Sequence, residues 1–227
     1  MDALIQTYGI SYNYPRREES LTQVDFSLYS GDLVALTGPN GAGKTTFLHL
    51  LVGLRKAKAG QIYAFGKTRE AEPDFVEVRA KAGFLFQNPD DQLFCPTVLE
   101  DVAFGPLNLG KSREQALEIA CATLASLGMS GFEERVAYQL SGGEKRMIAL
   151  ASVLAMEPEV LLLDEPTNAL DKKARKKLID TLQTLPQSMI LVSHDEEFVS
   201  LIANRHIRLE SARFVETEDW PTGQAAL

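Results

Sequence analysis

The residues with the clearest chemistry form a glycine-rich loop at 38–46, which follows a short apolar run at 33–37. Glycines leave backbone N–H groups open to phosphate oxygens, and a helix that opens behind the loop adds a favourable dipole. In such a loop Lys44 neutralises the β- and γ-phosphates, and the Thr45 hydroxyl ligates Mg²⁺. We therefore predict that ATP and Mg²⁺ bind here. The predicted binding residues are Gly38, Pro39, Asn40, Gly41, Ala42, Gly43, Lys44, Thr45 and Thr46.

Two carboxylates end a second apolar run, Val-Leu-Leu-Leu-Asp-Glu at 160–165. Asp164, at the end of the expected strand, is placed to hold the Mg²⁺ shell. Glu165 points to the other side if the strand alternation continues, and we predict that it acts as general base or positions the attacking water. Such a group contributes roughly 10²–10⁴-fold to the rate. Without the glycine loop, an acidic pair at a solvated strand end would be the simpler interpretation.

Polar residues also follow two other short apolar runs. Gln87 follows Phe84-Leu85-Phe86, and His194 follows the run that begins at Met189. If these strands are parallel, their carboxyl ends meet at the edge that faces the nucleotide. We predict that His194 senses the γ-phosphate and that the Gln87 amide binds Mg²⁺ or the attacking water. A lone histidine at a strand end is otherwise more often structural.

A second anion-binding turn lies at Leu140-Ser141-Gly142-Gly143-Glu144. Ser141 and Glu144 have the spacing of a capping box, and the two glycines leave the first N–H groups of the following helix open to an anion. The simpler interpretation is an ordinary capped helix. One phosphate loop holds one nucleotide, however, so a second anion-binding turn suggests that two chains hold each nucleotide.

The elements that must position these residues are short apolar strands alternating with helices. Continuous apolar runs indicate a parallel sheet covered on both faces. Strand-forming residues before position 30 and at 61–65 predict an antiparallel layer, and Ser112 and Gln115 cap a helix that Gly128 ends. We predict an α/β domain over 1–227, with a core and antiparallel layer at 1–87 and 157–227 and a helical insertion at 88–156. The expected strands are 33–37, 84–86, 160–163 and 189–193, and the expected helices include 44–51, 172–185 and 195–203.

The composition of the chain argues against several classes of function. The 227-residue chain has a net charge of −8, which disfavours a broad nucleic-acid surface and predicts no nucleic-acid partner. Cys95 and Cys121 form no disulfide framework, and the three histidines are too scattered for a metal cluster. No apolar run approaches the ~20 residues needed to cross a bilayer, and no signal peptide is evident. We therefore expect a soluble, cytosolic chain that can dock on a membrane partner.

In their order along the chain, these motifs resemble the nucleotide-binding subunit of ATP-binding-cassette (ABC) transporters. Residues 38–46 match Walker A, Gln87 the Q-loop, 140–144 the signature, 161–165 Walker B, 168–171 the D-loop and His194 the switch histidine. Tyr14 is similar to the aromatic residue that stacks on adenine, with Tyr12 as the alternative. The resemblance implies a P-loop NTPase (RecA-like) core and two cassettes packed head to tail, so that Ser141, Gly142, Gly143 and Glu144 of one chain meet the ATP held by the other. Asp171 would then lie at the seam between the cassettes, although it also suits a helix N-cap.

Residues 87–94 and 100–106 more closely resemble the ATPases of energy-coupling-factor importers, including cobalt and nickel systems. This resemblance implies an integral membrane coupling protein, a substrate-binding membrane component, and a place at the cytoplasmic face of the membrane. Phe94, Val98, Val102 and Phe104 would line the groove for the coupling protein or belong to the core of the insertion. The second cassette is either another copy or a paralogue. Competing functions are a soluble ABC ATPase in translation or DNA repair, and a small-molecule kinase.

Overall fold

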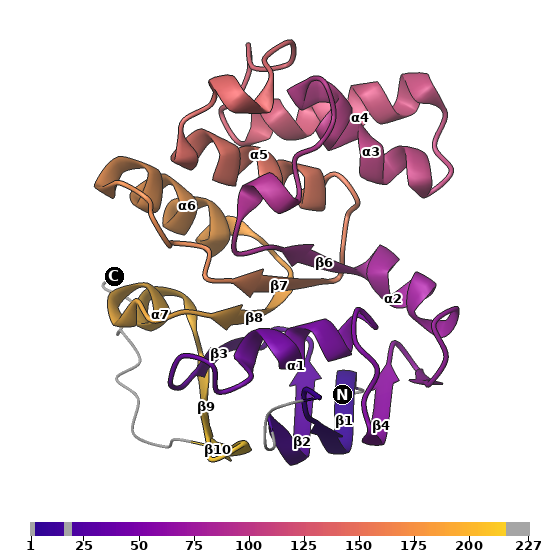
Figure 1. Cartoon of the computed structure of the whole chain (residues 1–227). Coiled ribbons are helices and arrows are strands. Elements are labelled where there is room, and N and C mark those ends of the chain that lie inside the picture. The colour runs from indigo at the N-terminus through magenta and orange to yellow at the C-terminus, as the bar shows by residue number, and fades with distance from the viewer. Residues whose placement is uncertain (1–2, 16–19, 217–227) are drawn as a thin grey trace.

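Two β-sheets organise the chain (Figure 1). The structure is a computed structural model that describes residues 3–15 and 20–216. The larger sheet has the strand order β10-β9-β3-β8-β7-β6, and the smaller has the order β2-β1-β4-β5.

The bounds of the elements follow. The strands are β1 (Ala3–Tyr12), β2 (Leu21–Tyr29), β3 (Leu33–Thr37), β4 (Ala59–Ala64), β5 (Lys67–Arg69), β6 (Ala82–Leu85), β7 (Val160–Asp164), β8 (Ser188–Val192), β9 (Arg205–Glu210) and β10 (Arg213–Glu216). The α-helices are α1 (Lys44–Leu51), α2 (Asp74–Lys81), α3 (Val98–Asn108), α4 (Arg113–Ser126), α5 (Gly142–Leu154), α6 (Lys172–Thr184) and α7 (Glu196–Ile202). Two 3₁₀ turns, η1 (Pro89–Asp91) and η2 (Ala137–Gln139), lie within 88–156.

The larger sheet is parallel from β9 to β6 and is buried on both faces. Side chains alternate across it, so Val34 and Leu36 of β3 join one hydrophobic cluster and Ala35 joins the other. Every residue of β7 and β8 is buried. Continuous apolar runs are typical of strands covered on both sides, and the α/β fold predicted from them is confirmed.

Helix α1 lies between the two sheets, and Phe75 and Val78 of α2 join the same hydrophobic cluster, whereas α3 to α7 cover the opposite face of the larger sheet (Figure 1). Phe47, Leu48 and Leu51 of α1 pack with residues of β1, β2 and β3. In the view of Figure 1, α3, α4 and α5 form a layer above β6 and β7. Residues 88–156 contain helices and turns only, and their apolar residues share one hydrophobic cluster with the sheet. The division at residues 88 and 156 stays a prediction.

The structure contains elements that the sequence did not predict, and it shortens two predicted strands. Strand β9 pairs in parallel with β3, and helix α2 precedes β6. Sequence analysis missed both, although Ile207 and Leu209 alternate with charged residues as in a half-buried strand. Phe65 lies outside β4, in a left-handed turn with φ 50°, and Phe86 lies beyond the end of β6. Because aromatic residues favour strands, their types alone did not reveal these ends.

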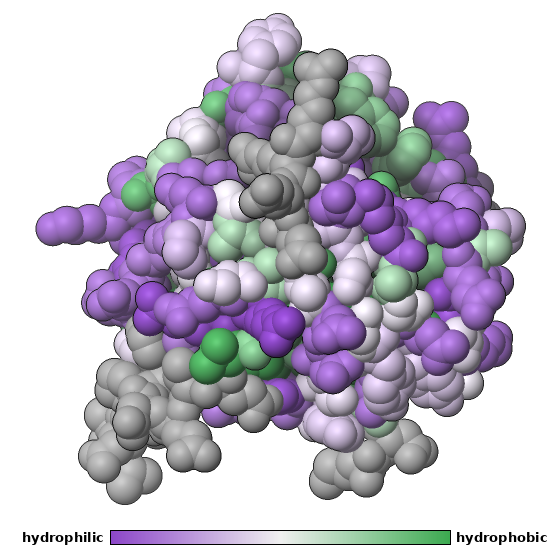
Figure 2. Space-filling view, turned by 60° about the horizontal axis from the view of Figure 1, so that its bottom comes forward, coloured by the Kyte–Doolittle hydropathy of each residue, from purple (hydrophilic) through white to green (hydrophobic). Residues whose placement is uncertain are grey.

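The surface is dominated by hydrophilic residues on the face that Figure 2 shows, with hydrophobic residues in small separate groups. This agrees with a charged-residue content of 24%. Within residues 3–15 and 20–216, no helix is long and apolar enough to cross a membrane.

Candidate nucleotide-binding site

The glycine loop joins the carboxyl end of β3 to the start of α1. Gly43 caps α1 with φ 114°, a left-handed conformation, and a Cβ there would lie 2.6 Å from the Ser20 carbonyl oxygen. Gly38 has φ 137°, and a Cβ there would lie 2.4 Å from the carbonyl oxygen of Leu209. Only glycine fits these two positions, because any other side chain would meet a strained backbone and a neighbouring strand or loop at once. The loop is therefore held tightly against the sheet.

The ammonium group of Lys44 lies inside the loop. Its Nζ donates to the carbonyl oxygens of Gly38 (2.8 Å) and Pro39 (3.1 Å) and lies 3.3 Å from His194 Nε2. Burial lowers the pKa of Lys44, and the nearby carboxylates of Glu165 and Asp164 oppose that shift. A partly desolvated cation inside a glycine-rich loop suits the phosphates of a nucleotide.

Thr45 and Asp164 bring two hard oxygen donors together. The Thr45 hydroxyl donates to Asp164 Oδ1 at 3.1 Å, and Asp164 is only 2% exposed. Burial raises the pKa of Asp164, while the Thr45 hydrogen bond and the charges of Lys44 and Arg146 oppose this. The described residues contain no group of three His, Cys, Asp or Glu that could hold a metal. The donor pair nevertheless fits Mg²⁺, which is usually bound by one or two carboxylates, a nucleotide phosphate and water.

Glu165 departs from the strand geometry that sequence analysis assumed. It lies beyond the end of β7 and has φ 47°, so its orientation comes from a left-handed turn and not from continued strand alternation. Its Oε1 lies 3.3 Å from His194 Nε2, and its Oε2 accepts from the His194 N–H at 3.3 Å. Burial raises the pKa of Glu165, with His194 opposing. A strained, half-buried carboxylate with a raised pKa suits a group that exchanges protons.

One cavity of about 400 Å³ gathers most of the predicted site. Its lining residues are Tyr14, Ser20, Asn40, Gly41, Gly43, Lys44, Thr45, Thr46, Gln87, Glu165, Val192 and His194. Sequence analysis missed Ser20 and Val192. Ser20 lies at the cavity because its backbone packs against Gly43, and Val192 lies there because it is the last residue of β8. No residue of 140–144 is among those that line the cavity in the described part of the chain.

The turn at 140–144 forms the expected capped helix start. The Ser141 side chain accepts from the Glu144 N–H, and Glu144 Oε2 accepts from the Ser141 N–H at 2.7 Å. The hydrogen bonds that the Ser141 N–H and hydroxyl donate to the Glu144 carboxylate lower the pKa of Glu144. A Cβ at Gly142 would meet nothing within 4 Å. The turn is therefore rigid and open towards solvent, outside the cavity at its own glycine loop.

Two further predicted residues lie at defined places. The Tyr14 hydroxyl is 3.0 Å from Thr46 Oγ1, and the Arg55 guanidinium lies 4.8 Å from the centre of the Tyr14 ring. Tyr12, the alternative aromatic residue, contacts Tyr14 edge-on and is not among the residues lining the cavity. Asp171 caps α6 by accepting from the Ala174 N–H at 2.8 Å. The N-cap role of Asp171 is thus confirmed, while its place at a seam stays a prediction.

Sequence analysis missed Arg146, which lies 3% exposed between α5 and the segment after β6. Its two terminal nitrogens donate to the carbonyl oxygens of Phe86 and Gln87, each at 2.6 Å. Burial lowers the pKa of Arg146, and Asp164 opposes the shift. An arginine at the start of a helix normally points to solvent, so only its position next to the apolar run at 147–155 hinted at burial.

We expect Thr45→Val to raise the Mg²⁺ concentration that half-saturates ATP hydrolysis by about 10–100-fold, as is usual when a metal site loses a supporting oxygen. The reason is that valine keeps the shape of threonine and removes the hydroxyl beside Asp164. Steady-state hydrolysis at increasing Mg²⁺ measures the change, and Thr184→Val on the exposed end of α6 is the control. An unchanged Mg²⁺ requirement would remove Thr45 from the metal site.

Comparison with known proteins gives consistent results. A family described as "ABC transporter" matches residues 21–168. A Brucella suis protein, named as an ABC transporter ATP-binding protein, is 51% identical over 195 residues, which are 86% of this chain and 81% of that protein. The energy-coupling factor transporter ATP-binding protein EcfA of Methanothermobacter thermautotrophicus is 43% identical over 217 residues, which are 93% of this chain and 70% of the relative.

Solved structures show the same fold. The structure of cbiO1 from Clostridium perfringens, described as part of the ABC transporter complex cbiONQ, has a TM-score of 0.84 and 29% identity, covering 95% of this chain and 88% of that one. A dimeric post-hydrolysis structure of an ATP-binding cassette with ADP and Pi also has a TM-score of 0.84, at 27% identity, covering 96% and 99%.

Proposed function

The chain belongs to the ABC transporter family and is one of its nucleotide-binding ATPases, and from that premise we propose that it powers an importer of the energy-coupling-factor type. In this proposal two cassettes close head to tail on ATP, and hydrolysis releases them. The second cassette is another copy of this chain or a paralogue. Relatives named as energy-coupling factor ATPases, at 43% and 42% identity, support the transporter class.

The head-to-tail arrangement rests on one observation. The chain has two anion-binding elements, and the turn at 140–144 contributes nothing to the cavity at the glycine loop of its own chain. The turn is preorganised by its capping box, and Gly142 is open. A rigid, open helix start is a ready site for a phosphate group. A second cassette packed head to tail supplies that phosphate, so Ser141, Gly142, Gly143 and Glu144 would contact its ATP.

Within one site, the described geometry suggests a role for each side chain. Lys44 binds the β- and γ-phosphates, and Thr45, Asp164 and Gln87 hold Mg²⁺, which would neutralise charge on the phosphates during transfer. Glu165 accepts a proton from the attacking water or orients it, and its raised pKa suits that task. His194, which contacts both Lys44 and Glu165, is placed to sense the γ-phosphate.

The adenine and the seam between cassettes involve two further residues. Tyr14 would stack on adenine, because it lines the cavity beside Thr46. Asp171 would also lie at the seam. It caps α6 from an exposed position, and α6 shares a hydrophobic cluster with α5, the helix that begins at the 140–144 turn. Loss of either residue would weaken binding without removing the chemistry of hydrolysis.

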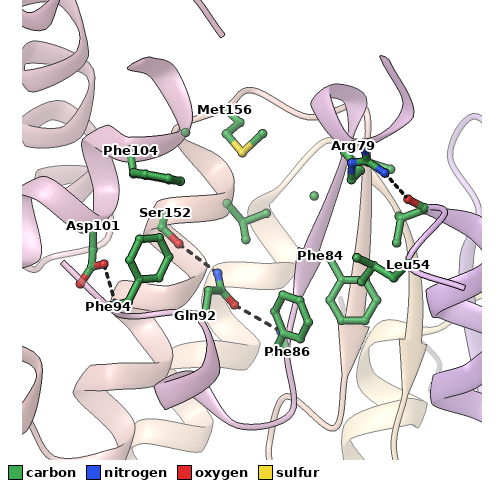
Figure 3. Close-up of a pocket in the computed structure, with 15 residues that line it drawn as sticks. Leu54, Arg79, Phe84, Phe86, Gln92, Phe94, Asp101, Phe104, Ser152 and Met156 are labelled. Atoms are coloured by element: carbon green, nitrogen blue, oxygen red, sulfur yellow. Dashed lines mark hydrogen bonds between the residues drawn. The ribbon is translucent and has the colours of Figure 1, made fainter. Parts of the chain in front are cut away.

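A second cavity, of about 230 Å³, provides a docking site for a membrane partner (Figure 3). It is lined by residues of α2, β6, α3 and α5 and of the segments that connect them, most of which are apolar. Phe94 and Phe104 are among the lining residues, meet edge-on, and are 65% and 44% exposed. Val98 and Val102, expected as possible groove residues, instead lie in the core at 1% and 0% exposure, because they face α4 and α5 across the helical layer. Of the four residues expected at the groove, Phe94 and Phe104 line the cavity and the two valines do not.

The proposal places the cassette at the cytoplasmic face of the membrane, bound to an integral coupling protein. A substrate-binding membrane component would contact the cargo, which is a metal ion such as cobalt or nickel, or a vitamin. Exposed aromatic residues beside an apolar cavity are typical of sites that take a partner helix. The cassette itself never contacts the cargo in this arrangement.

Phe94→Ser combined with Phe104→Ser is expected to reduce co-purification of an integral membrane protein at least ~10-fold, since buried aromatic anchors dominate interface energies. Affinity purification from detergent-solubilised membranes, with mass spectrometry of the recovered proteins, measures this. The control is Tyr8→Ser, which removes an aromatic residue 51% exposed on the smaller sheet. Recovery of ribosomes or DNA by the unmodified chain would instead support the soluble ATPase.

A further inference from the structure

Helix α5 begins at the 140–144 turn and also holds the segment after β6 that carries Gln87. The Arg146 guanidinium binds this segment near its start through the carbonyl oxygens of Phe86 and Gln87. Gln92 binds it at its end, where the amide nitrogen donates to the Ala149 carbonyl. The same nitrogen donates to the Ser152 hydroxyl (Figure 3). The Gln92 amide oxygen also accepts from the Phe86 N–H at 3.3 Å.

Burial of the charged Arg146 guanidinium is unfavourable for the free energy of folding. Its side chain is 97% removed from solvent, its Nε has no hydrogen-bond partner among the described residues, and no carboxylate pairs with it directly. Burying an unpaired charge costs several kcal/mol, and an apolar residue of similar volume is often as stable or more so. What the arginine adds at this position is therefore its pair of hydrogen bonds to Phe86 and Gln87.

The geometry of the guanidinium suggests its task. The planar guanidinium holds its two N–H donors in a fixed relative orientation. The two acceptors are the carbonyl oxygens of consecutive residues, Phe86 and Gln87. These carbonyl groups belong to the two peptide planes that flank the Cα atom of Gln87. Holding both planes fixes the backbone at Gln87 and so limits the directions in which its side chain leaves the backbone. Gln87 lines the cavity that also contains Lys44 and Glu165.

We propose that Arg146 is a positioning residue that fixes Gln87 in the nucleotide site and ties it to the 140–144 turn of the same chain. The inference rests on the role of Gln87 in the proposed function. Arg146 lies two residues after Glu144, within the first two turns of α5. If the nucleotide held by a second cassette shifts this turn, the backbone of Gln87 in the same chain as the turn would therefore move with it.

The charge of Arg146 has a separate effect on the same site. It opposes the rise in the pKa of Asp164, together with Lys44 and the Thr45 hydroxyl. A lysine at 146 would keep the charge but has no planar fork to hold two carbonyl groups. The variant Arg146→Lys therefore separates the electrostatic effect from the positioning of Gln87.

A double-mutant cycle tests the proposal. We expect Arg146→Met and Gln87→Ala each to lower kcat by about 10–100-fold, with KM for ATP changed less than about threefold, as for residues that orient a metal or catalytic ligand. The double variant of Arg146→Lys and Gln87→Ala should be no slower than Gln87→Ala, because it keeps the charge at position 146 and residue 146 then has nothing left to position. Arg146→Lys should remain close to Arg146→Met in kcat. The control, Lys176→Met, removes an exposed cation from α6.

The outcomes are distinct. If Gln87→Ala leaves kcat unchanged, the role of Gln87 in the proposed function is wrong, and this proposal is wrong with it. If Gln87→Ala is slow but the two effects multiply in the double variant, or if Arg146→Lys restores kcat, Arg146 acts otherwise and only this proposal is wrong. Nucleotide affinity and thermal unfolding, measured for every variant, detect a merely structural effect, which would lower affinity and unfolding temperature along with kcat and also contradict the proposal.

Discussion

Replacing Glu165 with glutamine is expected to slow ATP hydrolysis by roughly 10²–10⁴-fold, the contribution usual for a positioned general base. The amide keeps the shape of the carboxyl group and its contacts near His194, but it cannot accept the proton of the attacking water. Glu165 is the carboxylate that the left-handed turn after β7 places in the cavity, and burial raises its pKa. Both features point to a proton acceptor and away from a purely structural group.

The same variant is expected to keep ATP-dependent dimers, because binding of the nucleotide uses Lys44 and the 140–144 turn. Steady-state phosphate release measures the rate, and light scattering during size-exclusion chromatography with ATP measures the dimer. Glu118→Gln, an exposed change on α4, is the matched control. Full turnover by the Glu165→Gln variant would remove this residue from the mechanism.

Lys44→Ala is expected to weaken ATP binding by about 10²–10⁴-fold, equivalent to losing two charge-assisted hydrogen bonds of ~1.5–3 kcal/mol each. Lys44 is placed for this role inside the loop, where its ammonium group is held by two loop carbonyls and faces the cavity. The lowered pKa of Lys44 shows that burial disfavours its charge, so an anionic ligand would offset that cost.

Calorimetric titration with ATP measures the affinity of the Lys44→Ala variant, and thermal unfolding shows whether the loop remains folded. The matched control is Lys176→Ala, which removes a cation 75% exposed on α6. Affinity within a few-fold of the unmodified chain would mean that the phosphate site lies elsewhere. The Lys44→Ala and Glu165→Gln variants thus separate binding from hydrolysis at one site.

The local chemistry of the site was predictable because short sequence motifs determine it. The loop at 38–46, the Asp164-Glu165 pair and the Ser141-Glu144 capping box each depend on residues close in sequence. Parallel strands then bring their carboxyl ends to one edge, which is why Gln87 and His194 meet Lys44 in one cavity.

Features set by tertiary packing were not predictable in this way. Arg146 is buried because the segment at 86–87 crosses over α5, a contact between residues about sixty positions apart. Val98 and Val102 have the same residue types as groove-lining positions, and only the packing of α3 on α5 shows that they face inward. At Glu165, the turn out of β7 depends on a hydrogen bond to Val192 in the neighbouring strand.

The central claim is that each nucleotide site is completed by the 140–144 turn of a second cassette. The direct test places a thiol-directed photo-cross-linker on Ser141→Cys, in a chain that also carries Glu165→Gln, Cys95→Ser and Cys121→Ser. The account predicts an ATP-dependent cross-link, and sequencing of the linked peptide should find the glycine loop of a second chain, either another copy or a related cassette. A cross-link to the glycine loop of the same polypeptide, or one formed equally without ATP, would contradict it.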